Sequence, residues 1–324
     1  MPYQFYRNLL SKEEQKLYDL FYLGFECCEH SIRLPKVDKT TIQHVFKSVL
    51  YDNPNIFYVE GLNTRYTILS ANTVVYPVYK FNAETISRHE CAYQSVVNRI
   101  VAYSKTFDDY EKVKLVHDLF CRKISYDTNH PDAHSIVGAL IDKIAVCDGI
   151  ARAAKLLFDA MGLKSCVVCG KATQNDVPIE NHAWNKVKID GNWYNLDITY
   201  DIECSKCGCI RYDYFNVSDI EISKEHQQAQ YAYPVCNSNK ASFYHRNNLC
   251  ISTREQLEKL FSDVIINGGN QLTVKWTNEQ NQITNEHIQK LVEEILRNFA
   301  QGVQYQLFYN LSTMVFTTIL SCGK

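Results

Sequence analysis

A cysteine stands at the start of a helical pattern near the middle of the chain. In IAVCDGIARAAKLLFDAMG, residues 144–162, apolar residues recur three and four positions apart after Cys147, which predicts a helix with one buried face. Gly162 follows where a C-terminal cap is expected. Cys147 therefore falls at or just before the first turn, where unpaired N–H groups and the helix dipole favour the thiolate, the nucleophilic form of cysteine. The alternative is a small buried residue, as most free cysteines are.

A hairpin pattern places a histidine beside a carboxylate. The run NHAWNKVKIDGNWYNLDITYD, residues 181–201, has alternating apolar residues on both sides of an Asp-Gly turn at residues 190–191. This register sets His182 and Asp197 on one face as diagonal neighbours, with Cα atoms about 7–8 Å apart. A carboxylate on one imidazole nitrogen fixes the tautomer, and the other nitrogen can then accept a proton from a thiol. With Cys147, the pair predicts a Cys–His–Asp triad; taken singly, each is an ordinary strand residue.

Three separated motifs resemble the bacterial branch of the transglutaminase-like superfamily. VCDGIA, NHAWN and DITYD follow, in the same order, the family's Cys-Asp/Glu-Gly-Tyr-Ala, His-Ala-Trp-Asn and Asp-Val-Thr-Trp-Asp motifs, and HDLFCRKISYD lies upstream of them. The resemblance covers about residues 90–220. Ile150 replaces a usual tyrosine and Tyr200 a usual tryptophan, at positions that are secondary to the triad.

The resemblance implies an α+β fold with a papain-like core, in which the helix that bears the cysteine packs on an antiparallel sheet. It implies Cys147 as nucleophile, His182 as general base and Asp197 as the orienting carboxylate. The implied reaction is acyl transfer from an amide bond of a protein or peptide, through a thioester, to an amine or to water. A cysteine peptidase or amidase of the same fold is the nearest alternative. A non-catalytic protein-interaction module is the second.

Two further residues are candidates for oxyanion or substrate-lining positions. An oxyanion needs two donors, and the backbone N–H of Cys147 can supply one. Ile141, six residues earlier, stands where papain-like proteases often carry a glutamine, so a second donor must come from elsewhere. Tyr126 is a candidate for that donor, with a packing role as the alternative. Trp184 is expected to shield the site or line the acyl-acceptor groove, or else to belong to the core.

A group of cysteines follows the hairpin. Cys204, Cys207 and Cys209 fall within six residues and offer three thiol ligands for zinc. Cys236 or His226 would complete such a site. The usual second C-x-x-C or H-x-H pair is missing, so reduced loop thiols are the favoured interpretation and no metal is expected.

The remaining candidate groups carry no expected chemistry. Cys166 and Cys169 have the spacing of a redox pair, but on a strand they point to opposite faces. His117 and His134 flank the triad region and are expected to be helix-face or loop residues. The sequence has no calcium-binding EF-hand loop and no glycine-rich phosphate loop, so we expect no cofactor.

The elements that must position these residues form three predicted units. Residues 1–82 are expected to be an α+β module, residues 83–244 the transglutaminase-like catalytic domain and residues 245–324 a small α/β domain. The expected helices cover residues 11–32, 40–51, 84–104, 108–124, 135–141, 144–162, 253–261 and 285–299. The expected strands cover residues 56–61, 65–69, 73–81, 165–172, 182–189, 192–199, 272–276, 305–309 and 314–320.

The composition is that of an ordinary globular protein. The 324 residues are 46% hydrophobic and 22% charged, and the net charge of −2 gives no indication of a nucleic-acid or anionic membrane partner. The charge-free run 298–323 is rich in Gln, Asn and Thr and predicts strands rather than a membrane helix. Thirteen cysteines without a regular framework, and a start unlike a signal peptide, lead us to expect free thiols in the cytoplasm.

Overall fold

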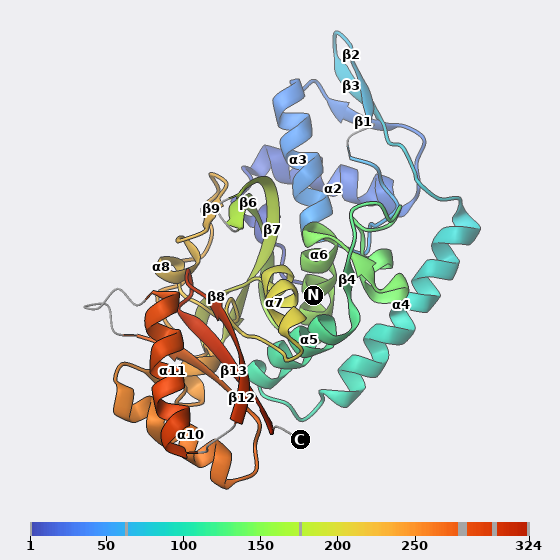
Figure 1. The fold of residues 1–324 in the computed structure, drawn as a ribbon. Helices are drawn as coiled ribbons and strands as arrows, with labels where there is room; N and C mark the ends of the chain where they lie inside the picture. Colours follow the sequence, from blue (N-terminus) through green and yellow to red (C-terminus); the bar gives the residue numbers. More distant parts are fainter. Residues whose placement is uncertain (1, 62–63, 175–176, 278–283, 300–302, 323–324) are drawn as a thin grey trace.

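The computed structural model describes residues 2–61, 64–174, 177–277, 284–299 and 303–322. Its central elements are α4 (Ala83–Tyr103), α5 (Asp109–Lys123), β4 (Ser125–Tyr126), a π-helical turn (Gly138–Asp142), β5 (Ile144–Ala145), α6 (Cys147–Ala160), β6 (Ser165–Gln174), β7 (Val177–Ile189), β8 (Asn192–Leu196), α7 (Ile198–Cys204), a 3₁₀ turn (Ser205–Cys207), α8 (Asp219–Ile222), β9 (His226–Gln228) and α9 (Phe243–Arg246). Four of these strands form an antiparallel sheet in the order β8-β7-β6-β9. Helix α6 packs against β6 and β7 of this sheet (Figure 1). This confirms the predicted α+β class and its core, a cysteine-bearing helix on an antiparallel sheet.

Helix α6 is anchored to the sheet by its apolar face, as its periodicity predicted. Leu157 and Phe158 are fully buried, and burying one such side chain stabilises the fold by about 1.5–3 kcal/mol. At the end of the helix, Gly162 adopts a φ of 81°, the left-handed conformation of a C-terminal cap. At its start, a Cβ on Gly149 would lie 2.1 Å from the carbonyl oxygen of Ala133, so only glycine lets that loop approach the first turn.

The hairpin between β7 and β8 has the predicted register. Ile189 pairs with Asn192 and Val187 with Tyr194. The two turn residues, 190–191, have φ angles of 47° and 86°.

 Positive φ at both central residues is typical of a type I′ turn, whose twist matches that of the flanking strands. The hairpin therefore sets which residues of β7 and β8 share a face.

The second strand of the hairpin ends earlier than predicted. A strand over residues 192–199 is wrong after Leu196, because Asp197 caps the N-terminus of α7. Its Oδ1 accepts a hydrogen bond of 3.1 Å from the N–H of Tyr200. Aspartate is among the strongest N-cap residues, and here capping prevails over the strand pattern. Asp197 is therefore fixed at the junction between strand and helix.

The N-terminal part contains α1 (Phe5–Leu9), α2 (Lys12–Glu26), β1 (Ile32–Pro35), α3 (Lys39–Asp52), β2 (Arg65–Ile68) and β3 (Asn72–Tyr76). Its antiparallel sheet has the order β1-β3-β2. The predicted strand over 56–61 is wrong: Ile56, Phe57 and Tyr58 are buried within turns. A short apolar run indicates burial, and periodicity alone does not decide its conformation.

The predicted helix over residues 11–32 ends early. Helix α2 stops at Glu26, and Cys28 follows with a left-handed φ of 51°. The N–H of Glu29 then bonds to the carbonyl of Gly24 at 2.8 Å, which is the bond pattern of a Schellman cap. This cap turns the chain into β1, which the sequence pattern did not predict.

The C-terminal part contains β10 (Cys250–Ile251), α10 (Arg254–Ile266), β11 (Gln271–Trp276), α11 (Asn285–Phe299), β12 (Val303–Asn310) and β13 (Val315–Cys322). Its sheet has the order β10-β11-β13-β12 and its own hydrophobic core, whereas the main core takes side chains from both residues 1–82 and residues 83–244. The three-domain division stays a prediction. Within the described ranges, no helix is both long and apolar enough to cross a bilayer.

Candidate functional site

Cys147 is the first residue of α6, as predicted, and its side chain is half-buried. Its thiol lies close enough to the ring of His182 on β7 to contribute to the raised pKa of that imidazole. Because the first N–H groups of a helix have no carbonyl partner within it, the N–H of Cys147 is available to an oxyanion. The helix start therefore brings a sulfur, a base and a donor together.

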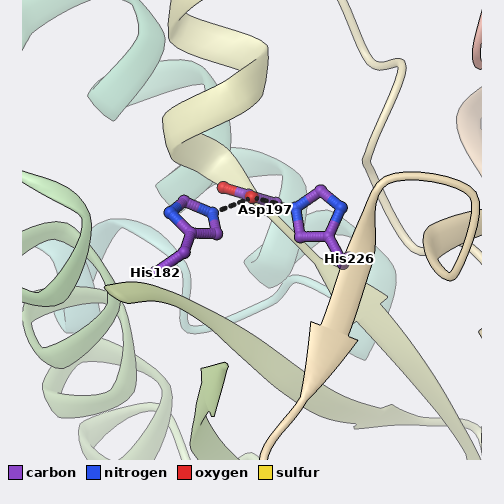
Figure 2. A group of neighbouring side chains, drawn as sticks. All are labelled: His182, Asp197 and His226. Carbon is purple, nitrogen blue, oxygen red and sulfur yellow. Dashed lines mark hydrogen bonds and ion pairs between the residues drawn. The ribbon is translucent and has the colours of Figure 1, made fainter. Parts of the chain in front are cut away.

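His182 and Asp197 meet as the hairpin register predicted. His182 Nε2 lies 2.6 Å from Asp197 Oδ2, and both side chains are buried (Figure 2). An ionised carboxylate only accepts hydrogen bonds, so Nε2–H is the donor and Nδ1 is the nitrogen left for Cys147. The imidazole therefore lies between thiol and carboxylate, with a separate nitrogen for each.

The electrostatics of this pair favour an imidazolium beside a carboxylate. Burial opposes the charge on His182, but the charge and hydrogen bond of Asp197, together with the contact to Cys147, raise the pKa of His182 to about 10. Burial likewise opposes ionisation of Asp197, but His182 and His226 hold the pKa of Asp197 well below its usual range. The arrangement can stabilise the proton that a thiol would release.

His226 is a site residue that the sequence analysis did not place here. Its Nε2 lies 2.8 Å from the same Oδ2 of Asp197, and its side chain is fully buried (Figure 2). The sequence analysis considered His226 only as a zinc ligand. It lies in the polar run SKEHQQAQ, residues 223–230, which carries no local signal of burial. Only the pairing of β9 with β6 brings this ring inside.

The three side chains in Figure 2 also form the one candidate metal group found among the described residues. A tetrahedral zinc ion with bonds of 2.0–2.1 Å holds its ligand atoms about 3.3 Å apart. The contacts of Asp197 Oδ2 with His182 Nε2 and His226 Nε2 are 2.6 and 2.8 Å. These are hydrogen-bond distances, so the geometry fits shared protons better than a bound cation.

The cysteines after the hairpin do not converge as a zinc site among the residues the structure describes. Cys207 Sγ and Cys209 Sγ are 3.4 Å apart, but Cys204 Sγ instead accepts a hydrogen bond of 3.8 Å from Asn310 on β12. Cys236 is buried, with its thiol against the carbonyl of Pro234. Cys204 ends α7 and Cys207 ends the 3₁₀ turn, so the expectation that these are loop thiols is wrong for these two residues.

Tyr126 lies near the nucleophile. Strand β4 pairs with β5 so that Tyr126 is opposite Ala145, two residues before Cys147. Burial, followed by the negative charges of Cys147 and Asp148, raises the pKa of Tyr126 to about 12. The side chain is 42% exposed, so an incoming carbonyl can reach it. Tyr126 stays a candidate oxyanion donor.

Trp184 packs against the base. Its side chain is buried, and its ring stacks on that of His182 with centroids 5.9 Å apart. Its indole N–H donates a 3.2 Å hydrogen bond to Asn195 Oδ1, so the donor is already satisfied. This geometry supports a shielding and packing role. A role in lining the acceptor groove stays a prediction.

The comparisons with known proteins agree with these motifs. Residues 94–198 match the transglutaminase-like superfamily, and no curated protein matches the chain significantly. One similar solved structure is a candidate cysteine protease from Cytophaga hutchinsonii, with 18% identity, a TM-score of 0.30, and coverage of 40% of this chain and 51% of that chain. Another is the periplasmic domain of TgpA from Pseudomonas aeruginosa, with 15% identity, a TM-score of 0.29, and coverage of 42% and 56%.

A third similar structure is that of menin, which reveals the binding site of menin for the Mixed Lineage Leukemia protein. It has 20% identity, a TM-score of 0.26, and coverage of 37% of this chain and 26% of that chain. The chain thus spans about half of the length of these structures or less. TM-scores of this size support no conclusion about the function of this chain. The family match supports a cysteine enzyme in general terms without distinguishing transfer from hydrolysis. The chain therefore carries a transglutaminase-like domain, as its three motifs predicted, and residues 94–198 include Cys147, His182 and Asp197.

Proposed function

We propose that this protein is a cysteine acyltransferase that acts on carboxamide groups of proteins or peptides through a thioester on Cys147. The observation that carries the proposal is the 2.6 Å hydrogen bond between His182 Nε2 and Asp197, which leaves the other ring nitrogen free while the thiol of Cys147 lies near the same ring. This arrangement allows a proton to move between sulfur and imidazole while the carboxylate holds the ring.

In the first half of the reaction, the Cys147 thiolate attacks the carbonyl carbon of the amide. The N–H of Cys147 and the hydroxyl of Tyr126 are the proposed donors to the oxyanion. The imidazolium of His182 gives its Nδ1 proton to the leaving nitrogen, the C–N bond breaks, and ammonia or an amine departs. A thioester and a neutral imidazole remain.

In the second half, His182 accepts a proton from the incoming nucleophile as that nucleophile attacks the thioester. A primary amine gives a new amide, and water gives a carboxylic acid. The C–S bond then breaks and the thiolate re-forms beside the imidazolium. Transfer and hydrolysis therefore share every protein group and differ only in the acceptor.

A screen of acyl donors with and without an added amine tests the proposal. A glutamine-containing peptide is incubated with a fluorescent primary amine, and release of ammonia, labelling of the peptide and cleavage of its backbone are measured together. Labelling with ammonia release supports transfer. Ammonia release alone identifies a deamidase, backbone cleavage a peptidase, and no reaction a non-catalytic module.

The matched controls are two cysteine variants. Cys147→Ala should abolish every product, because it removes the nucleophile. Cys121→Ala should leave the products unchanged, because that thiol lies in the interior of α5. Activity that survives in Cys147→Ala would overturn the proposal.

A further inference from the structure

We propose that His226 is a positioning residue of this site, whose Nε2–H holds the Asp197 carboxylate against the ring of His182. The inference rests on the proposed function and extends it to a residue outside the three family motifs. His226 touches no substrate in this role. It acts through Asp197.

The carboxylate of Asp197 is held by donors from three directions. Oδ2 accepts hydrogen bonds from His182 Nε2 at 2.6 Å and from His226 Nε2 at 2.8 Å. Oδ1 accepts one from the N–H of Tyr200 at 3.1 Å. The two imidazole rings have centroids 5.3 Å apart and planes tilted by 57°. Without His226, Oδ2 keeps a single donor, and rotation of the carboxylate is no longer opposed from the far side.

The tautomer of His226 follows from its partner. Because an ionised carboxylate only accepts hydrogen bonds, His226 must carry its proton on Nε2. Nδ1 is buried without a hydrogen-bond partner. A buried polar atom in this state is unfavourable to the fold, because it has lost its hydrogen bonds to water. The ring is thus placed for its contact with Asp197 and not for the satisfaction of its own polar atoms.

The surroundings of His226 would suit an apolar side chain. Its ring lies 5.1 Å from that of Trp184, 4.7 Å from that of Tyr200 and 5.7 Å from that of Tyr214. An aromatic residue such as phenylalanine would fill this space without leaving a nitrogen unpaired. A histidine here is explained by the hydrogen bond that it gives to Asp197.

A close backbone contact places His226. Strand β9 pairs with β6 so that His226 is opposite Ala172 and Gln228 opposite Gly170. A Cβ on Gly170 would lie 2.2 Å from the carbonyl oxygen of Gln227, so glycine is what allows β9 to lie this close. The edge strand therefore serves to deliver the ring to Asp197.

Two substitutions separate positioning from packing. His226→Phe fills the same space without a donor, and His226→Gln keeps an N–H donor at a similar reach. We expect His226→Phe to lower kcat of the acylation step on the order of tenfold or more with KM unchanged, because the misplaced carboxylate no longer orients the base. We expect His226→Gln to recover most of that loss. His117→Gln, at a buried histidine whose ring nitrogens contact Asp118 and Asp201 and not Asp197, is the matched control and should keep wild-type kcat.

A spectroscopic measurement gives a readout that does not require activity. In protein labelled with ¹⁵N-histidine, the His182 Nε2–H proton should resonate far downfield and shift in His226→Phe, but stay near its wild-type position in His226→Gln. The inference would be overturned if kcat were equal in all three proteins, or if kcat fell equally in both variants. It would also be overturned if the His182 Nε2–H signal did not shift in His226→Phe. A wild-type protein that is inactive while its His182 signal responds to His226 would instead overturn the proposed function alone.

Discussion

Two buried clusters in this molecule contain the same kinds of side chain, and only one has the arrangement of a catalytic site. The first joins Cys147, His182 and Asp197. In the second, His117 lies between two carboxylates, with Nδ1 at 3.1 Å from Asp118 Oδ1 and Nε2 at 3.1 Å from Asp201 Oδ2. The thiol of Cys121 lies 3.6 Å from that same Nε2.

The difference lies in how the ring nitrogens are used. His182 gives one nitrogen to a carboxylate and keeps the other for the thiol, so a proton can move between sulfur and ring. Both nitrogens of His117 are held by carboxylates, which leaves none to accept a proton from Cys121. Burial opposes its charge, but Cys121 and the two carboxylates raise the pKa of His117 well above its usual range. The second cluster holds a fixed charge rather than a mobile proton.

The position of each cysteine in its helix reinforces this difference. Cys147 begins α6, where backbone N–H groups are unpaired. Cys121 lies within α5, where the backbone N–H groups are bonded to the preceding turn. Proximity of a thiol, an imidazole and a carboxylate is therefore not enough. A helix start and a free ring nitrogen are also needed.

The largest expected effect concerns the two thiols. Cys147→Ala should lower kcat for acyl transfer on the order of 10⁴-fold or more, because no other group can form the thioester. Cys121→Ala should leave kcat within about twofold of wild type, because its thiol lacks a base. Amine incorporation into a glutamine peptide measures both. Similar losses in the two variants would break the distinction between the clusters.

A smaller effect separates the two carboxylates. Asp197→Asn should lower kcat roughly 10³–10⁴-fold, because the amide can select the wrong tautomer of His182. Asp201→Asn should keep kcat but destabilise the fold by about 3–5 kcal/mol, because it removes one partner of a buried charge. Steady-state kinetics and urea unfolding measure the two quantities. The prediction fails if Asp201→Asn loses activity while fully folded.

Thiol reactivity should differ by about tenfold or more between the clusters. A low concentration of iodoacetamide near neutral pH should label Cys147 well before Cys121 and the other thiols, with the site identified by peptide mass spectrometry. His182→Ala should slow labelling of Cys147 and leave Cys121 unchanged. Uniform labelling, or equal labelling of Cys147 in His182→Ala, would contradict an activated nucleophile.

The smallest expected effect is on stability as a function of pH. The pKa of His182 is raised to about 10, so its contribution is fully present below its unfolded value of about 6.5 and is lost as the pH rises to about 10. The free energy of unfolding of the wild-type protein, measured in urea, should therefore decrease over this pH window more than that of His182→Gln. Parallel curves for the two proteins would show that His182 carries no raised pKa.

Much of the site follows from local sequence. The apolar periodicity after Cys147 and the cap at Gly162 predict α6, and the Asp-Gly turn predicts the register that brings His182 to Asp197. These signals involve residues a few positions apart, so they can be read without the fold. Where two local signals compete, the prediction failed: a strand pattern ran through Asp197, and its capping of α7 prevailed.

Other features depend on contacts between distant segments. His226 lies 29 residues after Asp197 in a polar run, and nothing in that run predicts a buried ring. Residues 56–59 are apolar enough for a strand, but Phe57 and Tyr58 lie in a buried turn and Val59 makes only an isolated bridge to Tyr79. The sequence pattern likewise does not tell which ring nitrogen faces which partner, because that depends on the approach of α6 to the sheet.

The sequence by itself determined the helix that begins at Cys147, the hairpin, and the pairing of His182 with Asp197, because turns, caps and side-chain periodicity are set by neighbours along the chain. Only the tertiary structure decided that the thiol of Cys147 comes near the ring of His182, that His226 shares the carboxylate of Asp197, and that Cys121 and His117 form a separate cluster with two carboxylates. Those outcomes depend on how α5, α6 and β9 pack on other elements, and packing is a property of the whole chain.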